Sequence, residues 1–388
     1  MTTELHPALR RHPRRAAAPV IVVAVVAAVL VWSPWSHDAE VSAKPGLAST
    51  RCLPFDEPRS VTDLNRIVAG YRTTQEFQGG DVGADVTLQD GRLLYVFGDT
   101  LRGPSYGAKR FVRNSMLVFG PHCAGIVSRV DHGAIIPDRP DGVGYWPMSI
   151  AKVSRGSYDL VGVMAQRVRT TGPQEFENLG SSLAVFRVDR GASPQLIDVT
   201  DLGPDDAHRT RTTWGAAAVV KGDWVYLYGT ANPEKPLVFG WSLSVARTHI
   251  DDLATPSRWQ YFDGRRWQPD AAKASRLIPA DGGVSQTLSV FESGGRWYAL
   301  SKRDDFVGKD LVVWSAPGPT GPFTPSRPLA SIPSRGRTLQ YMPLAHPDVL
   351  AKPGSVVVSV SHNTTDAALL DQDPYLYRPT FLRVALPR

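Results

Sequence analysis

Two aspartates, Asp81 and Asp99, stand at the two ends of a short stretch whose residue pattern predicts a β-hairpin. Residues 84–88 and 93–97 are apolar runs, and Asp-Gly between two such runs is a strong hairpin signal. A three-residue turn centred on Asp90 pairs residues whose numbers sum to 180, which brings Asp81 opposite Asp99. Opposed residues have β-carbons roughly 4.5–5.5 Å apart. The pattern therefore predicts two carboxyl groups close enough to act on one bond.

This pairing depends on the length of the turn and on the glycines around it. A two-residue turn would shift the register by one residue and place the two side chains on opposite faces. The glycines at 79, 80, 83 and 98 also permit bulges. If the pair forms, each carboxylate raises the pKa of the other, so that one of them holds a proton near neutral pH. A simple turn role for both aspartates is the alternative interpretation.

The N-terminal region has the charge pattern of an export signal. Four arginines precede the apolar stretch, and together with Glu4 they account for half of the formal net charge of +6. We expect a basic cytoplasmic segment at 1–16, a signal peptide or uncleaved signal anchor at 17–33, and a tether at 34–69. A buried core helix is the alternative for the apolar stretch. We therefore expect an exported protein of the cell envelope, either secreted or attached to the membrane through its N-terminal segment.

The cysteines and the short motifs narrow the chemistry further. An exported chain with only Cys52 and Cys123 favours a disulfide, which would join the segment before the hairpin to a loop behind it; two unpaired thiols are the alternative. No metal-type Cys/His spacing, P-loop, nucleophile elbow or dinucleotide fingerprint is present, so we expect no cofactor and no metal. No basic stripe is interleaved with aromatic residues, so we expect no nucleic-acid partner.

From residue 70 onward the chain has the pattern of an all-β domain. Short runs rich in β-branched and aromatic residues are broken by Gly, Pro, Asp and Asn, after a possible short helix at 61–68. The runs form five similar sets, whose equivalent points recur every 55 to 72 residues. A period of this size, built from strand meanders, predicts a five-bladed β-propeller over residues 70–388. A β-sandwich is the alternative, but it does not account for five similar sets.

Propeller geometry would place the start of each inner strand and the end of each second strand on the same face. The residues that we expect to ring this mouth of the central channel are Asp81, Asp99, Trp146, Trp214, Gln286 and Tyr341. Acids beside aromatic faces suit a sugar, because aromatic rings stack on its apolar faces while acids address its oxygens. Packing between blades is the alternative role for the two tryptophans.

Three further residues are candidates for the same mouth. Asp85 would add a third carboxylate, and Arg113 and Asn114 precede another strand that begins there. For Asp85, a solvent-facing strand position is the alternative interpretation.

The motifs GGDVGADVTLQDG and YVFGDT resemble the opening of the actinobacterial and mycobacterial endo-D-arabinanases, a family of five-bladed propeller glycoside hydrolases. The resemblance extends from about residue 70 to the C-terminus, with its specific motif in the first blade. It implies endo-cleavage, with retention, of the D-arabinan of arabinogalactan and lipoarabinomannan. It also implies that Asp81 is the acid/base and Asp99 the nucleophile. Asp85 is less typical of that family.

Two other functions fit the same residues. One is an inverting, arabinanase-like furanosidase that uses Asp85 as a base or modulator. The other is a non-catalytic propeller that binds wall glycan or a partner protein. Retention goes with carboxyl groups roughly 5–5.5 Å apart and inversion with a gap of roughly 6.5–9.5 Å, whereas salt-bridged acids would indicate a binding protein.

Overall fold

The structure, a computed structural model, describes residues 47–70, 74–172 and 175–387. The chain divides into two units, residues 1–32 and 33–388, and every described residue belongs to the second. The expected basic segment and signal anchor therefore lie outside the described residues. Within the described part of the chain, no helix is long and apolar enough to cross a membrane.

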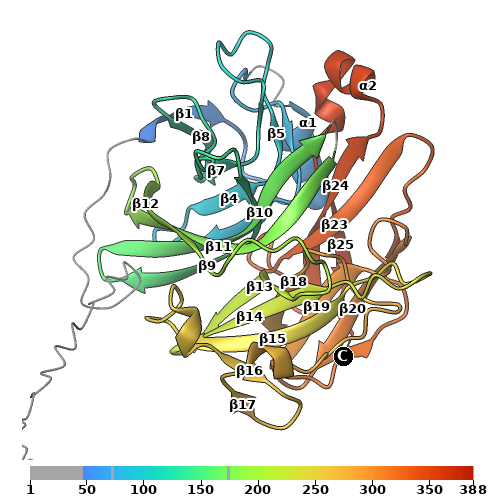
Figure 1. The fold of residues 1–388 in the computed structure, drawn as a ribbon. Coiled ribbons are helices and arrows are strands. Elements are labelled where there is room, and N and C mark those ends of the chain that lie inside the picture. Colours follow the sequence, from blue (N-terminus) through green and yellow to red (C-terminus); the bar gives the residue numbers. More distant parts are fainter. Residues whose placement is uncertain (1–46, 71–73, 173–174, 388) are drawn as a thin grey trace, which may run out of the picture. The chain divides into compact units, whose positions relative to one another are not determined.

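In the described residues of the second unit, strands that pair antiparallel far outnumber helical residues, which confirms the predicted all-β class. Its larger sheets follow one another in chain order, from blue through green and yellow to red in Figure 1. The first is β3 (Ala84–Thr87), β4 (Leu93–Phe97), β7 (Ser115–Phe119), β8 (Cys123–Arg129) and β1 (Leu47–Pro54); the second is β9 (Gly144–Arg155), β10 (Tyr158–Gly172), β11 (Glu175–Asp189) and β12 (Gln195–Asp201); the third is β13 (Thr213–Lys221), β14 (Trp224–Ala231), β15 (Ser242–His249), β16 (Gln260–Phe262) and β17 (Trp267–Gln268).

The fourth and fifth sheets complete the series. The fourth is β18 (Ser289–Ser293), β19 (Arg296–Lys302) and β20 (Asp310–Ala316) with β21 (Thr324–Pro325) and β22 (Ala330–Ser331) on its edge, and the fifth is β23 (Thr338–His346), β24 (Ser355–Thr364) and β25 (Thr380–Ala385). A small sheet joins β2 (Gly79–Gly80), β5 (Thr100–Leu101) and β6 (Phe111–Val112). The short helices are α1 (Val61–Gly70), α2 (Ala367–Gln372), η1 (Pro256–Arg258), η2 (Ala271–Lys273) and η3 (Pro374–Leu376).

The first strands of these sheets form a closed circuit. Strands β3, β9, β13, β18 and β23 contact one another in that order, and β23 contacts β3 again. Each gap between successive sheets is filled by its own cluster of buried apolar side chains, including the gap between the last sheet and the first, where Phe381 packs near Phe97. Sheets arranged in this way form a propeller-like fold, in which burial between neighbouring sheets supplies most of the stabilisation.

The hairpin at the start of the domain has the predicted register. Strand β3 pairs with β4 so that Val86 lies opposite Leu94, and β2 pairs with β5 so that Gly80 lies opposite Thr100. The turn is closed by the Leu88 N–H, which donates to the Arg92 carbonyl at 2.7 Å. Gly91 has a φ of 85°, a conformation that favours glycine. The predicted three-residue turn is therefore confirmed.

The segment at 34–69, expected to be a tether, contributes two elements to the domain. Strand β1 pairs with β8 at the edge of the first sheet. Helix α1, which confirms the expected short helix, packs on β25 at the edge of the last sheet. The Asn65 amide donates to the Phe381 carbonyl at 2.9 Å, and its oxygen accepts from the Phe381 N–H at 2.8 Å. An asparagine side chain thus binds the two free backbone groups of an edge strand, which joins the two ends of the domain.

The cysteines lie on adjacent strands. Cys123 is disulfide-bonded, and on the backbone Cys52 of β1 lies opposite Gly125 of β8. The side chain of Cys52 is outside the described residues, so its bond to Cys123 stays a prediction.

Replacing Asn65 with Ala should lower the free energy of unfolding by about 1–3 kcal/mol, because two half-buried backbone groups of Phe381 lose their partner. Chemical denaturation at neutral pH measures the change. Arg66→Ala is the control, since Arg66 is 73% exposed and makes only an ion pair within its own helix, and it should cost less than about 0.5 kcal/mol. Equal effects of the two substitutions would show that Asn65 does not join the two ends of the domain.

Candidate active site

Asp81 and Asp99 lie side by side where the first hairpin opens. The Asp81 N–H donates to the Asp99 carbonyl at 3.3 Å, and the Gly98 N–H donates to the Asp81 carbonyl at 2.9 Å. Two residues of one strand thus face one residue of the other, which is a bulge of the kind that the nearby glycines permit. A β-carbon at position 98 would lie only 2.6 Å from Oδ1 of Asp81. Glycine at 98 therefore leaves the room that the Asp81 carboxyl group occupies.

Each carboxyl group accepts a hydrogen bond from an aromatic side chain of another sheet. The Tyr341 hydroxyl on β23 donates to Oδ2 of Asp81 at 2.8 Å, and the Trp146 Nε1 on β9 donates to Oδ1 of Asp99 at 2.7 Å. The Tyr377 hydroxyl also hydrogen-bonds to Asp81. The structure thus brings two of the predicted mouth residues, Trp146 and Tyr341, to the aspartate pair.

Burial controls the protonation of the pair. Burial raises the pKa of Asp81 to about 6, against hydrogen bonds from Tyr341 and Tyr377 that favour its charged form. Burial, and next the neighbouring Asp81 carboxylate, raise the pKa of Asp99 well above its usual range. Both pKa values are raised, and the charge on one carboxyl group opposes ionisation of the other, so the first ionisation favours a state with one shared proton. The pair can therefore offer one proton donor and one negative oxygen at the same time.

Irregularities in the inner strands lie close to the mouth. Pairing shifts register beside Trp146 in β9, after Trp214 in β13 and after Tyr341 in β23. At the first hairpin, Asp81, Val82 and Gly83 separate β2 from β3, and Val82 and Gly83 have φ values of 65° and 78°. Bulges redirect side chains and are common beside active sites. The same device thus recurs in four of the sheets at the level of the aspartate pair.

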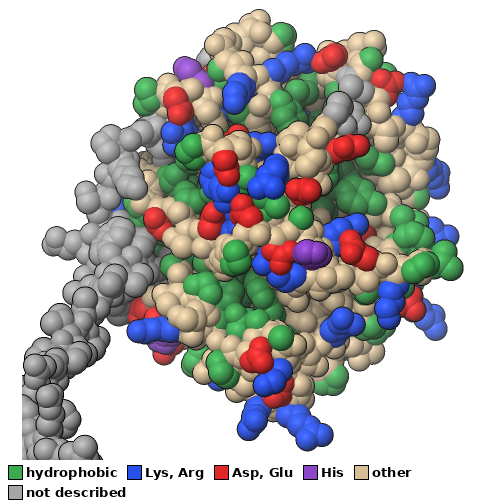
Figure 2. Space-filling view, viewed as in Figure 1, with side chains coloured by type: hydrophobic (Ala, Val, Ile, Leu, Met, Phe, Trp, Pro, Cys, Tyr) green, Lys and Arg blue, Asp and Glu red, His purple; other side chains and the backbone are tan. Residues whose placement is uncertain are grey.

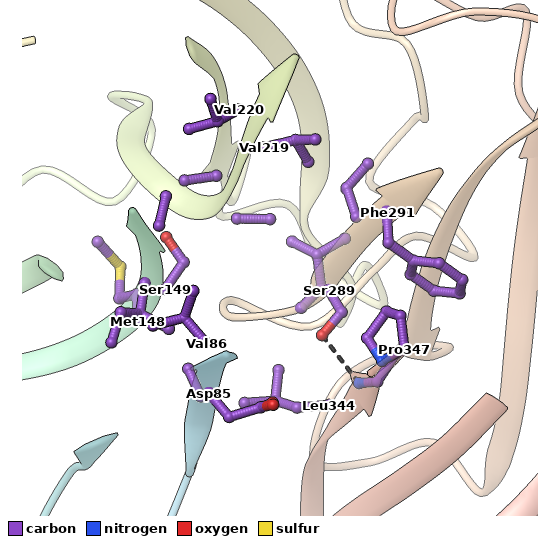
Figure 3. Close-up of a pocket in the computed structure, with 18 of the residues that line it drawn as sticks. Asp85, Val86, Met148, Ser149, Val219, Val220, Ser289, Phe291, Leu344 and Pro347 are labelled. Carbon is purple, nitrogen blue, oxygen red and sulfur yellow. Dashed lines mark hydrogen bonds between the residues drawn. The ribbon is translucent and has the colours of Figure 1, made fainter. Parts of the chain in front are cut away.

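A cavity with a volume of about 400 Å³ lies between the inner strands, and neither Asp81 nor Asp99 is among the residues that line it. Residues of all five inner strands line it, and Asp85, Ser149 and Ser289 are among the polar ones (Figure 3). Most of the remaining lining is aliphatic. The described residues contain no group of three or more His, Cys, Asp or Glu side chains arranged to hold a metal ion.

Asp85 is bound to a buried histidine. Its side chain is 6% exposed and hydrogen-bonds to Nδ1 of His346, so the solvent-facing alternative is wrong. Nε2 of His346 lies 2.8 Å from the Ser359 hydroxyl and 3.3 Å from the Tyr95 hydroxyl. This buried chain of polar groups connects the first sheet to the last, and it engages the carboxylate that was expected to be a third acid at the mouth.

The other predicted site residues divide between the mouth and the framework. The Gln286 amide donates to Gln166 at 3.0 Å, and Gln166 lies opposite Trp146 in the second sheet. This places Gln286 at the mouth. Trp214 instead packs on Tyr261, with ring centroids 5.1 Å apart, in the cluster between the second and third sheets. Trp214 thus has the packing contacts of the alternative interpretation, and its role in substrate binding stays a prediction.

Arg113 and Asn114 also differ in their roles. Asn114 is fully buried and makes three hydrogen bonds to the backbone of Ile136 and Tyr145, so the structure corrects its expected substrate contact to a framework role. The Arg113 guanidinium pairs with Asp138 at 2.9 Å, and its charge opposes the rise in the pKa of Asp99. Arg113 is thus close enough to stabilise negative charge on Asp99.

Sequence reasoning missed Tyr377. This side chain is 3% exposed, and its backbone carbonyl accepts from the Gly80 N–H at 2.7 Å beside the hairpin. It lies in an irregular segment after η3, outside any strand pattern, so no periodicity marks it. Only the cluster of aromatic residues at 375 and 377 distinguishes that segment in the sequence.

The surface has no region of a single charge sign on the face in view. Figure 2 shows basic and acidic side chains next to one another, and many form ion pairs, as Arg139 does with Asp141 and Asp205.

The fold and the site define a propeller-like all-β domain that carries a pair of aspartates with raised pKa values. Residues 69–386 match the family described as "Domain of unknown function (DUF5005)", and the chain belongs to this family. No curated protein matches the sequence.

The chain is similar to several solved structures, of which the first described below shares the fold. A protein from Bacteroides ovatus, named only as a candidate hydrolase, has 21% identity and a TM-score of 0.62, with 86% of this chain and 93% of that chain covered. The catalytic domain of a GH62 α-L-arabinofuranosidase from Coprinopsis cinerea has 10% identity, a TM-score of 0.47 and coverages of 87% and 96%. A GH43_1 enzyme from Xanthomonas citri has 14% identity, a TM-score of 0.44 and coverages of 83% and 93%. At 21% identity, the first likeness shows a shared fold and nothing about activity.

Replacing Asp81 with Asn should stabilise the protein at alkaline pH. The pKa of Asp81 rises from 3.8 to about 6 on folding, so its carboxyl group destabilises the folded state increasingly between about pH 4 and pH 6 and fully above pH 6. The Tm of Asp81→Asn should therefore match that of the wild type near pH 4 and exceed it by a few degrees at pH 8.

Asp131→Asn is the control with the opposite sign. The ion-paired Arg129 lowers the pKa of Asp131 to about 2, so this exposed carboxylate contributes a small stabilisation above pH 4 that the substitution removes. Thermal unfolding of all three proteins at pH 4, 6 and 8 makes the comparison. A Tm difference for Asp81→Asn that does not change with pH would contradict the raised pKa.

Proposed function

We propose that the protein is an endo-acting glycoside hydrolase that cleaves D-arabinofuranan of the arabinogalactan and lipoarabinomannan type. The proposal is carried by the aspartate pair, which combines a proton donor and a negative oxygen beside aromatic side chains. The resemblance of the GGD and FGDT motifs to endo-D-arabinanases supplies the substrate.

The proposed reaction is a double displacement with retention. Asp99 attacks the anomeric carbon and forms a C1–O bond to its carboxylate, while the glycosidic C1–O bond breaks and Asp81 donates its proton to the leaving oxygen. Water then attacks C1, gives its proton to Asp81 and displaces Asp99. Each step uses only the pair and water, so the proton balance closes within the site.

The resting site favours a different position of the shared proton. Asp81 accepts hydrogen bonds from two phenols, whereas Asp99 accepts one from an indole, and the pKa of Asp99 is the more strongly raised. The free site therefore holds the proton mainly on Asp99. The proposed roles require it on Asp81 when the substrate is bound. The charge of Arg113 favours that state, because it stabilises a negative Asp99.

The contacts of the aspartates favour neither of the two alternative functions, the inverting furanosidase and the non-catalytic binding protein. An inverting reaction through Asp85 would need that carboxylate free to activate water, but it is bound to His346. A binding protein would be expected to keep its acids in ion pairs, but Asp81 and Asp99 instead accept hydrogen bonds from neutral aromatic donors.

We further propose that each of the five larger sheets is one blade of a five-bladed propeller. The closed circuit of inner strands supports this count. We also propose export to the cell envelope through the N-terminal segment, on the charge pattern that precedes its apolar stretch.

Incubating the full-length protein with purified D-arabinan should release oligosaccharides of intermediate length first, as an endo-acting enzyme does. Chromatography of the products over time measures this. The Asp81→Asn/Asp99→Asn double variant is the control and should release nothing. If the wild-type protein leaves D-arabinan intact, the proposed function is wrong.

Azide rescue assigns the two roles. With an activated aryl arabinofuranoside, Asp81→Asn plus azide should give a glycosyl azide of retained configuration, because azide attacks the intermediate on Asp99. Asp99→Asn plus azide should give the inverted azide, because azide replaces the missing nucleophile. NMR of the anomeric proton distinguishes the products. The reverse pattern would exchange the roles of the two residues, and two variants with wild-type turnover would exclude the pair.

A further inference from the structure

The exposed apolar side chains gather at one end of the sheets. We define the mouth end as the end at which β9, β13 and β23 begin and β4 and β10 finish. Among the described residues, the well-exposed phenylalanines are Phe111, Phe176, Phe239 and Phe306, with exposed fractions from 41% to 55%. Strand direction places all four in segments at the mouth end. A cluster of exposed apolar groups on one face indicates a surface that binds something.

Phe306 lies against the aromatic partner of Asp81. Its ring stacks on Tyr341 with centroids 4.9 Å apart and planes 24° from parallel, and the Tyr341 hydroxyl donates to Asp81. Phe306 is 41% exposed, so part of its ring is open to solvent. A ring that meets water while touching the partner of a catalytic acid is in a position to contact a bound substrate.

The loop that presents Phe306 is held in a strained conformation. Asp304 and Asp305 have φ values of 59° and 49°, which side chains other than glycine rarely adopt. Asp305 is buried and accepts from the Trp241 indole at 2.9 Å, and the buried Lys302 donates to the Phe306 carbonyl at 3.3 Å. These contacts fix the backbone on both sides of the exposed ring.

Phe176 lies against the aromatic partner of Asp99 in the same way. Its ring meets Trp146 edge to face, with centroids 4.5 Å apart and an angle of 73° between the planes, and Trp146 donates to Asp99. Phe176 is 55% exposed. The two exposed rings thus come from different sheets. Each packs on the aromatic residue that donates to one of the two carboxyl groups.

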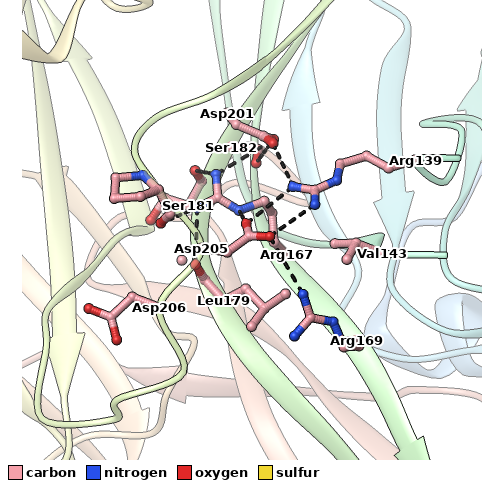
Figure 4. A network of polar contacts seen from close by, with 12 residues as sticks. Arg139, Val143, Arg167, Arg169, Leu179, Ser181, Ser182, Asp201, Asp205 and Asp206 are labelled. Carbon is pink, nitrogen blue, oxygen red and sulfur yellow. Dashed lines mark hydrogen bonds and ion pairs between the residues drawn. The ribbon is translucent and has the colours of Figure 1, made fainter. Parts of the chain in front are cut away.

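A buried arginine braces the hairpin that carries Phe176 (Figure 4). Arg167 on β10 donates to the carbonyls of Leu179 and Ser181 on β11 and of Pro204 beyond it, each at 2.9–3.0 Å. It also pairs with Asp205 at 3.0 Å. The Asp205 carboxylate compensates the charge, and the two terminal nitrogens of the guanidinium donate to backbone carbonyls. This network holds the long hairpin in position beneath Phe176.

We propose that Phe176 and Phe306 are stacking platforms for sugar rings on the two sides of the bond that is cleaved. The inference rests on the proposed function and adds the residues that determine recognition of the polymer. The apolar C–H face of a sugar ring packs on an aromatic ring, and the fixed backbone means that little ordering is needed on binding. Platforms on both sides of the pair require an internal bond of the polysaccharide, which accounts for endo cleavage.

The test measures binding and turnover of D-arabinan oligosaccharides of increasing length by the full-length protein. Phe176→Ala and Phe306→Ala should each raise KM by about two- to tenfold on long oligosaccharides, since an aromatic contact contributes about 0.5–1.5 kcal/mol. Phe176→Tyr and Phe306→Tyr keep the ring and should stay near wild type. Calorimetry in the Asp81→Asn/Asp99→Asn background should show the same loss of affinity without turnover.

Tyr158→Ala is the matched control. Tyr158 is a half-buried aromatic residue at the opposite end of β10, where it packs under Arg187, so its loss should leave KM unchanged. If the wild type cleaves D-arabinan and both Phe→Ala variants match its KM and affinity, the platforms are wrong and the proposed function stands. If the wild type neither binds nor cleaves the polymer, the proposed function fails and this inference fails with it.

Discussion

Two like carboxyl groups side by side, in a half-buried site, are the interaction on which the rest of the structure depends. Burial and mutual repulsion both oppose ionisation, so the pair needs donors that no single sheet supplies. Tyr341 and Tyr377 come from the last sheet and the segment within it, and Trp146 comes from the second sheet. The electrostatics of the pair therefore require the first, second and fifth sheets to keep a fixed arrangement.

The seam, which is the junction between the first and last sheets, must hold these two sheets in a fixed arrangement. No single strand shared by both sheets closes it, since β1 adds to the first sheet and β25 to the last. Polar side chains join them instead: Asn65 binds the backbone of Phe381, and Asp85 binds His346. These contacts link residues that are 261 to 316 positions apart in the chain. Because the pair draws donors from both sides of the seam, closure of the fold and assembly of the site are the same event.

The sequence predicted the parts of this site that depend on local pattern. The Asp-Gly turn determines the register of the first hairpin, and that register places Asp81 beside Asp99. Strand starts located Trp146 and Tyr341, because the period of the sheets marks equivalent positions. The sequence could not distinguish Trp146, whose indole donates to Asp99, from Trp214, which packs on Tyr261. The two residues are of the same type and stand at the same position in their sheets. Contacts across the fold decide between them.

Other parts left no local signal. Asn114 looked like a polar residue at a strand start, but it is buried because Ile136 and Tyr145 offer backbone groups that need partners. Tyr377, Phe176 and Phe306 lie in irregular segments or near a hairpin tip, where no period constrains the residue type. Such positions acquire a role only when distant sheets bring them to the same place, which a pattern read along the chain does not record.

Rigidity at the mouth comes from buried charge rather than from a larger apolar core. Arg167 with Asp205, and Lys302 with Asp305, are costly to desolvate, and apolar side chains of similar volume would often be at least as stable. These groups provide directional hydrogen bonds, because one guanidinium or ammonium group can hold several backbone carbonyls in fixed positions at once. Both lie under segments that present an exposed phenylalanine to the aspartate pair. The strained loop, the charged networks and the exposed rings each lower the stability of the folded protein, and all of them lie at the mouth end. A preorganised surface at that end lowers the free-energy cost of binding a flexible polymer.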